Sequence, residues 1–142
     1  MPETKIRVLI ADDFKLLRDV IRMYLEKVQD ITVIDEAPNL DDALRSAGRS
    51  RPDVIIMNDH LPPLDSAYAA ALFRERGFTS GILIISMELE RALIESSLVK
   101  GANGVLHKDE IDDWVEEGVR QVHQGKDYLS PRARAAAITI PR

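Results

Sequence analysis

Several side chains that could handle a phosphoryl group stand where apolar runs of the sequence end. Asp12 and Asp13 follow one run, Ser86 ends another, and Lys108 ends a third. Two neighbouring carboxylates suit Mg²⁺, a hard ion that prefers oxygen ligands and keeps several waters. A lysine offers a point charge to phosphoryl oxygens, and a serine hydroxyl offers them a hydrogen bond. The combination predicts phosphoryl chemistry.

Taken singly, each of these residues has an ordinary explanation. Asp12 and Asp13 fit a turn and a helix N-cap, which favour aspartate through geometry and the helix dipole. Lys108 fits a surface lysine, and His60 a solvated loop histidine. The coincidence of the set at strand ends is what favours a site.

The nucleophile that such a site needs is missing at the expected place. The stretch "VIIMNDHLPPLD" is an apolar strand that ends at Asn58 and is followed by Asp59. An amide oxygen can ligate a metal or accept a hydrogen bond, but it is no carboxylate nucleophile at neutral pH. Neighbouring strand residues point to opposite faces, so Asp59 is a low-probability substitute.

The chain alternates between strand and helix patterns. Apolar runs predict five strands, at 6–11, 31–37, 53–57, 81–86 and 103–108. Helical spacing of apolar residues predicts five helices, at 16–28, 40–47, 66–76, 88–100 and 109–122. Asn39 is expected to cap the second helix, with Asp42 three residues later, and Gly101 to end the fourth.

Five strand–helix units with short connections predict a flavodoxin-like α/β fold. We expect a five-stranded parallel sheet in the order 2-1-3-4-5 with five helices on both faces. A closed eight-stranded barrel would need roughly 250 residues, so the sheet is open. Ligands of such sheets bind outside the carboxyl ends of the strands, where the polar residues above would meet.

Composition limits the class of protein. The 142 residues fit one domain, predicted as 1–126, followed by a basic linker or tail at 127–142. The net charge of −5 argues against nucleic-acid binding by this domain, and the absence of cysteine excludes disulfides and thiolate sites. The sequence shows neither a signal peptide nor an apolar run near the ~20 residues of a membrane span, so we expect a cytoplasmic protein without a membrane partner.

Four motifs together resemble the receiver domain of two-component response regulators over roughly residues 5–126. "VLIADDFKLLRDVIRMYL" resembles its first strand, acidic pair and first helix, and "RPDVIIMNDHLPPLD" its third strand and proline-bearing loop. "ILIIS" ends in the family's Ser/Thr, and "GANGVLHKD" carries its glycine-alanine turn and lysine. "YLSPRARA" is similar to the linker that leads to a helix-turn-helix output domain in transcription regulators of this kind.

The resemblance assigns a role to each polar residue and reveals two departures. Asn58 stands at the phosphoacceptor aspartate, and Val105 at the aromatic switch position, while Ser86 and Lys108 match the residues that contact the phosphoryl group. In the family the Ser/Thr swings toward the phosphoryl group and the aromatic turns inward behind it. Val105 is too small to fill an aromatic's pocket.

The implied cofactor is Mg²⁺, weakly bound or absent because one carboxylate is lost. Its implied ligands are Asp12, Asp13, the Asn58 amide oxygen and the backbone carbonyl of His60. Without a phosphoryl group, Lys108 is expected to pair with one of the two aspartates. Implied partners are a sensor histidine kinase or another regulatory protein, and DNA only through an output domain absent here. We expect a monomer or a weak homodimer.

Three interpretations follow. The leading one is a receiver-like regulatory module that is not phosphorylated, is not an enzyme, and acts through protein contacts. The second is an ordinary Mg²⁺-dependent phosphoacceptor receiver with an engineered aspartate-to-asparagine change at 58. The third is a flavodoxin-like enzyme, but "ADDFKLL" lacks the hydroxyl- and glycine-rich phosphate loop of a flavin protein and the Asp-x-Asp of an aspartyl-phosphate hydrolase.

Overall fold

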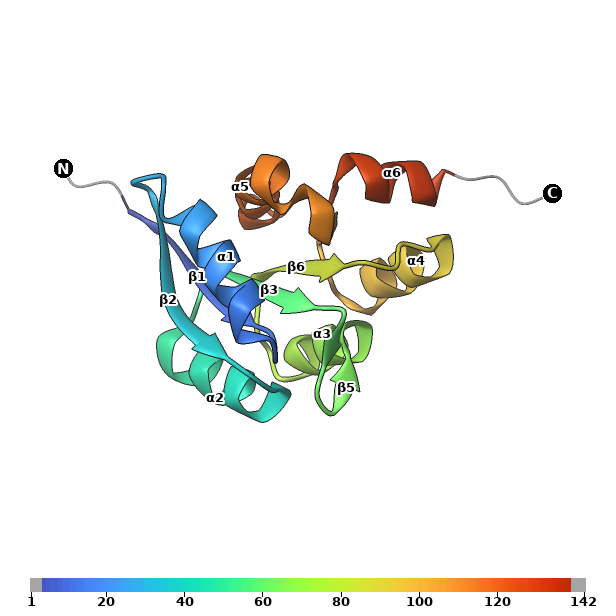
Figure 1. Ribbon diagram of the computed structural model, residues 1–142. Coiled ribbons are helices and arrows are strands. Elements are labelled where there is room, and N and C mark those ends of the chain that lie inside the picture. The colour runs from blue at the N-terminus through green and yellow to red at the C-terminus, as the bar shows by residue number, and fades with distance from the viewer. Residues whose placement is uncertain (1–3, 139–142) are drawn as a thin grey trace.

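A parallel sheet forms the centre of the protein in a computed structural model, which describes residues 4–138 (Figure 1). Six strands make up this sheet in the order β2-β1-β3-β6-β7-β8. Their bounds are β1 (Ile6–Ala11), β2 (Ile31–Ala37), β3 (Val54–Asn58), β6 (Gly81–Ser86), β7 (Gly104–His107) and β8 (Tyr128–Leu129). A separate antiparallel pair, β4 (His60–Leu61) and β5 (Leu64–Asp65), follows β3.

Helices cover both faces of the sheet. They are α1 (Lys15–Leu25), α2 (Leu40–Ser50), α3 (Ser66–Glu75), α4 (Arg91–Lys100), α5 (Ile111–His123) and α6 (Pro131–Ala137), with a short 3-10 turn, η1 (Lys108–Glu110), before α5. Figure 1 shows α1 and α5 on one side of the sheet and α2 and α3 on the other. Side chains of β1 alternate accordingly, since Val8 and Ile10 face α1 and α5 whereas Leu9 and Ala11 face α2 and α3.

Local signals in the sequence fix two of the helix ends. The Asn39 side chain accepts a hydrogen bond from the Asp42 backbone N–H at 2.8 Å, so the predicted cap of α2 is confirmed. The predicted end of α4 is also confirmed, because Gly101 follows it with φ of 124°, a conformation that side chains disfavour. Other ends differ: α4 begins at Arg91 rather than at 88, and α1 ends at Leu25 rather than at 28.

The flavodoxin-like parallel sheet is confirmed, but the numbers of strands and helices were wrong, since residues 4–138 form a six-stranded parallel sheet and six α-helices rather than five of each. The additional strand and helix, β8 and α6, come from the segment that was expected to be a linker or tail. β8 pairs in parallel with β7, and Ser130 caps α6 by accepting from the Ala133 N–H at 3.4 Å. A two-residue strand and a seven-residue helix are too short for a periodic signal, and tertiary packing stabilises them. Residues 139–142 lie outside the described part.

The helices within residues 4–138 include no candidate for a membrane span. None of these described helices is both long and apolar enough to cross a bilayer.

Candidate functional site

The strand ends meet at one edge of the sheet, which we call the carboxyl edge and define by Asp12, Asp13, Asn58, Ser86 and Lys108. The strands that end at or just before these residues, β1, β3, β6 and β7, are adjacent in this order. Ala11 is paired with Met57, Asn58 with Ile85, and Ser86 with His107. The parallel topology therefore brings the predicted residues to the same edge.

Asp12 is the buried member of the acidic pair. Its side chain is 2% exposed, and its Oδ1 accepts a hydrogen bond from the Phe14 N–H at 2.8 Å. Burial raises the pKa of Asp12 to about 6; the Phe14 hydrogen bond and the charge of Lys108 lower it, and Asp13 raises it. Asp13 itself is exposed. The two carboxylates thus differ in burial.

The raised pKa of Asp12 predicts a pH-dependent gain of stability in Asp12→Asn. The folded chain binds a proton between the ordinary pKa of 3.8 and about 6, so stability falls as pH rises through this window and stays lower above it. Asparagine keeps an acceptor for Phe14 and removes the buried charge. We expect a gain of about 2 kcal/mol in urea unfolding at pH 7.5 and almost none at pH 3.5. Asp13→Asn is the exposed control, and an equal gain at both pH values would contradict the assignment.

Asn58 is tied to the loop that follows it. Its Nδ2 donates to the His60 backbone carbonyl at 3.2 Å, while its Oδ1 is buried and has no hydrogen-bond partner among residues 4–138. The His60 ring is engaged elsewhere, with Nδ1 3.3 Å from Asp65 Oδ1. A carboxylate at position 58 could not make the bond to His60, because carboxylate and carbonyl oxygens are both acceptors.

Asp59 and Asn58 have different partners. Asp59 Oδ2 accepts a hydrogen bond from Ser86 Oγ at 2.7 Å, whereas Asn58 contacts the His60 carbonyl. Ser86 is fully buried and also accepts from the Glu88 N–H at 3.0 Å. The structure therefore places the carboxylate of Asp59 against the serine of the carboxyl edge.

Lys108 acts on the acidic pair from a distance. It opens η1 and is half-buried, and its charge lowers the pKa of Asp12. Between the residues described in the structure, no ion pair within 4.0 Å joins Lys108 to Asp12 or Asp13. The direct pair that the sequence suggested is thus not formed.

Val105 lies in a small apolar cluster rather than at the open edge. It is fully buried and packs with Ile94 of α4 and Ala133 of α6. Leu98 and Leu129 pack against the same cluster. Val105 is therefore covered by α6, which follows α5 and β8 in the chain.

Sequence reasoning missed Arg18 and Glu36, which hold the backbone at Asp12. Arg18 Nη1 donates to the Asp12 carbonyl at 2.6 Å, and its Nε donates to Glu36 Oε1 at 2.9 Å. Arg22 also binds Glu36, at 2.6 Å. A basic residue on the helix after an acidic pair, together with an acidic residue near the end of the second strand, was the available signal.

The oxygen atoms at this edge can be tested against Mg²⁺. Asp12 and Asp13 supply carboxylates, and the buried Asn58 Oδ1 is an acceptor without a partner beside the His60 carbonyl. Within the described residues, no cluster of three or more acidic or histidine side chains could hold a metal ion. The donor set fits a cation held by few carboxylates, and such sites are weak.

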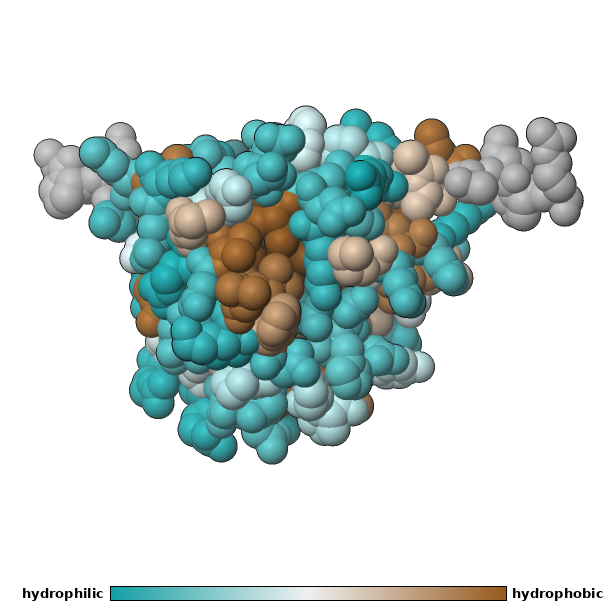
Figure 2. All heavy atoms as spheres, in the orientation of Figure 1, coloured by the Kyte–Doolittle hydropathy of each residue, from teal (hydrophilic) through white to brown (hydrophobic). Residues whose placement is uncertain are grey.

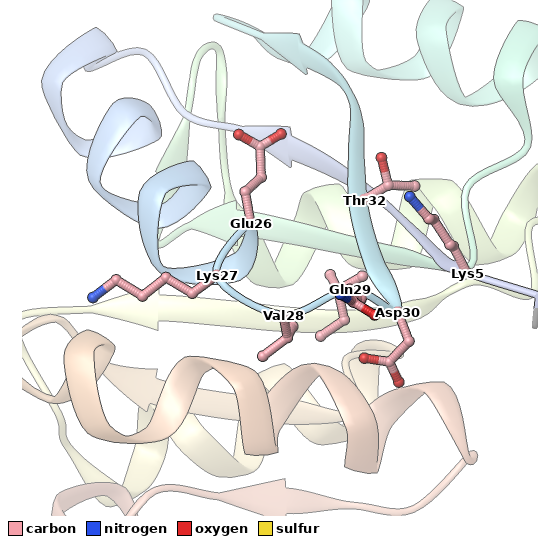
Figure 3. Close-up of a pocket in the computed structure, with 8 residues that line it drawn as sticks. Lys5, Glu26, Lys27, Val28, Gln29, Asp30 and Thr32 are labelled. Carbon is pink, nitrogen blue, oxygen red and sulfur yellow. The ribbon is translucent and has the colours of Figure 1, made fainter.

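A large pocket lies away from this chemistry. Its volume is about 780 Å³, and it is lined by Lys5, by residues 26–30 of the loop between α1 and β2, and by residues 31 and 32 at the start of β2 (Figure 3). Its acidic groups are already paired, Asp30 with Arg120 at 2.6 Å and Glu26 with Arg22 at 3.2 Å. It contains no residue of the carboxyl edge. We therefore assign the functional site to the strand ends.

Comparison with known sequences identifies the same family as the motifs. A family model described as the response regulator receiver domain matches residues 8–119. The chain is 32% identical over 127 residues to the uncharacterized transcriptional regulatory protein YvfU of Bacillus subtilis (strain 168), which covers 89% of this chain and 63% of that protein. It is 30% identical over 127 residues to the probable transcriptional regulatory protein NarL of Mycobacterium tuberculosis, with 89% and 59% covered. The chain thus spans about three-fifths of these curated relatives.

Solved structures agree with this result. The signal receiver domain of the putative response regulator NarL from Mycobacterium tuberculosis matches with a TM-score of 0.75 and 30% identity, over 83% of this chain and 98% of that one. A LuxR-family two-component response regulator from Aurantimonas sp. SI85-9A1 matches with a TM-score of 0.89 over 94% and 96% of the two chains; its 22% identity shows the fold alone. This chain therefore belongs to the response regulator receiver domain family.

Proposed function

We propose that this chain is a regulatory receiver module that takes no phosphoryl group at position 58 and acts through protein contacts. The observation that carries the proposal is the amide of Asn58 at the end of β3, where its Nδ2 donates to the His60 carbonyl at 3.2 Å. An amide has no carboxylate oxygen to attack phosphorus. The neighbouring hydroxyl, ammonium and carboxylates then form a binding edge without its reacting atom.

The Asn58 amide also contacts an oxygen that a bound cation would otherwise contact. Mg²⁺, when bound, would neutralise negative charge at the edge, with Asp12, Asp13, the Asn58 Oδ1 and the His60 carbonyl as its ligands. In this chain the Asn58 Nδ2 already donates a hydrogen bond to the His60 carbonyl. We therefore propose that the edge is ordered without a bound metal and that its affinity for Mg²⁺ is low.

A Mg²⁺ titration tests this proposal. Asn58→Asp raises the number of carboxylates at the edge from two to three, and affinity for hard cations rises with carboxylate count. We expect Mg²⁺ to bind Asn58→Asp about tenfold more tightly than the unmodified chain in isothermal titration. Asn58→Ala serves as the control that removes the amide without adding charge. Equal affinities of the unmodified chain and the Asn58→Asp variant would refute the assignment of these ligands.

Protein contacts are supported by the surface next to the carboxyl edge. Phe14 and Leu16, at the start of α1, are 59% and 62% exposed although they are large and apolar. Figure 2 shows apolar side chains, in brown, gathered between α1 and α5 and surrounded by hydrophilic surface. A sensor histidine kinase or another regulatory protein is the partner class we propose for this module.

We further propose that the module belongs to a protein that controls transcription. The relatives YvfU and NarL are described as transcriptional regulatory proteins, and they are longer than the region matched here. The net charge of −5 makes direct DNA binding by this module unfavourable, so DNA would be bound by an output domain.

A second candidate is an ordinary phosphoacceptor receiver in which Asn58 replaces an aspartate by engineering. It is favoured by the retained edge, since Asp12, Asp13, Ser86 and Lys108 all stand at adjacent strand ends. The valine at 105, packed under α6, favours natural divergence instead, because blocking the acceptor would not require it. Codon 58 of the gene decides between the two.

A further inference from the structure

We propose that Asp59 is a positioning residue that holds the Ser86 hydroxyl away from position 58. The inference rests on the proposed function only in that Ser86 would otherwise donate its hydrogen bond to a ligand bound at position 58. Ser86 Oγ donates to Asp59 Oδ2 at 2.7 Å, which is a short, charge-assisted hydrogen bond. A second acceptor, the Glu88 carbonyl, lies farther away at 3.2 Å.

Because a hydroxyl has one proton, the contact with Asp59 determines whether Ser86 can donate to a ligand. A serine hydroxyl has a single proton to donate, so Ser86 cannot serve Asp59 and a ligand at position 58 at the same time. Its oxygen is used as well, because the Glu88 N–H donates to it at 3.0 Å. Ser86 is fully buried, so water does not compete for the proton. The Asp59 contact therefore withdraws Ser86 from the site.

The backbone around Asp59 holds the carboxylate in place. The Asp59 N–H donates to the Ile85 carbonyl at 2.9 Å, and the Asp59 carbonyl accepts from the Ser66 N–H at 2.9 Å. These two bonds join the end of β3 to β6 and to the start of α3. The carboxylate is thus presented to Ser86 from a backbone fixed on both sides.

The contact would resist any ligand that needs Ser86. Asn58 is paired with Ile85, the residue before Ser86, and rotation about χ1 can turn the hydroxyl between staggered positions. A phosphoryl group at position 58 would have to replace Asp59 as the acceptor of the hydrogen bond from the Ser86 hydroxyl. A ligand shifts such an equilibrium only by its differential contacts. Asp59 accordingly weakens the response of this domain to a phosphoryl group.

Amide exchange at Glu88 tests the contact in the unmodified chain, without any phosphoryl chemistry. Asp59→Ala should free Ser86 and weaken the bond from the Glu88 N–H, so that Glu88 exchanges about tenfold faster. Asp59→Asn keeps an acceptor and should stay near the unmodified rate. In the Ser86→Ala background, Asp59→Ala should change little. Unchanged exchange at Glu88 in Asp59→Ala overturns the proposal.

The functional part of the proposal is tested in the Asn58→Asp background with acetyl phosphate and Mg²⁺. There a carboxylate oxygen of the introduced aspartate bonds to phosphorus while the bond from phosphorus to the acetate oxygen breaks and acetate leaves. Adding Asp59→Ala should raise the initial rate of adduct formation about tenfold when Ser86 is present, and less than twofold with Ser86→Ala.

The outcomes separate this proposal from the proposed function. Equal rate increases with and without Ser86 show that Asp59 acts by its charge alone and overturn the positioning role. An adduct on the unmodified chain would contradict the proposed function. If no Asn58→Asp variant forms an adduct, the carboxyl edge lacks more than its nucleophile, and the positioning of Ser86 is decided by the Glu88 exchange alone.

Discussion

Val105→Tyr is expected to release α6 from the rest of the domain. Val105 and Ala133 are both fully buried in one apolar cluster, where they pack with Ile94. A tyrosine does not fit this space, and overpacking a core costs about 1–3 kcal/mol. A seven-residue helix at the end of the described chain can move away, whereas β7 lies inside the sheet. We expect α6, not the sheet, to absorb the strain.

Hydrogen exchange and limited proteolysis measure this release. Amides of residues 132–137 should exchange roughly ten- to hundredfold faster in Val105→Tyr, and trypsin should cut sooner after Arg132 or Arg134. Val99→Tyr is the matched control, because Val99 lies on α4 and is 86% exposed. If α6 kept its protection while the whole domain lost stability, α6 would not be the element that covers position 105.

This packing gives the valine a role that the sequence alone could not show. An aromatic at position 105 would need the space in which Ala133 lies. β8 and the Ser130 cap hold α6 next to it, since the His107 N–H donates to Ser130 Oγ at 3.2 Å. Position 105 is therefore linked directly to the segment that follows the receiver helices.

The strands and the carboxyl edge could be predicted because their signals are long and local. The runs around Val8, Ile55 and Leu83 are apolar on both faces, which marks strands buried in a parallel sheet. Once the strands are parallel, topology alone brings Asp12, Asn58 and Ser86 to one edge. Four motifs in the expected order identified the family on the same residues.

The bonds within the edge could not be predicted, because they depend on side-chain rotamers that the tertiary structure selects. Nothing in the sequence favours Ser86 binding Asp59 rather than Asn58, or Arg18 reaching the Asp12 carbonyl. Lys108 illustrates the same limit: it opens η1 directly after β7 instead of ending the strand, and its distance from the aspartates was not predicted. Elements as short as β8 leave no periodic pattern at all.

Asn58→Asp is expected to give the edge the nucleophile it lacks. The new carboxylate stands beside Asp12, Asp13 and Lys108, so acetyl phosphate in the presence of Mg²⁺ should leave a single phosphoryl group on the protein. Without Mg²⁺ the variant should be about 1–2 kcal/mol less stable in urea unfolding, because it loses the hydrogen bond to His60 and adds a third negative charge. Asn58→Ala, which loses the bond without adding charge, separates the two contributions.

Intact-mass spectrometry after acetyl phosphate treatment in Mg²⁺ tests most directly whether position 58 is the only part the site lacks. The unmodified chain and Asn58→Asp are compared, each with and without Asp59→Ala. We predict no adduct on the unmodified chain and one phosphoryl group on Asn58→Asp, whether or not Asp59 is present. An adduct on the unmodified chain that disappears with Asp59→Ala would make Asp59 the acceptor and contradict the function proposed here.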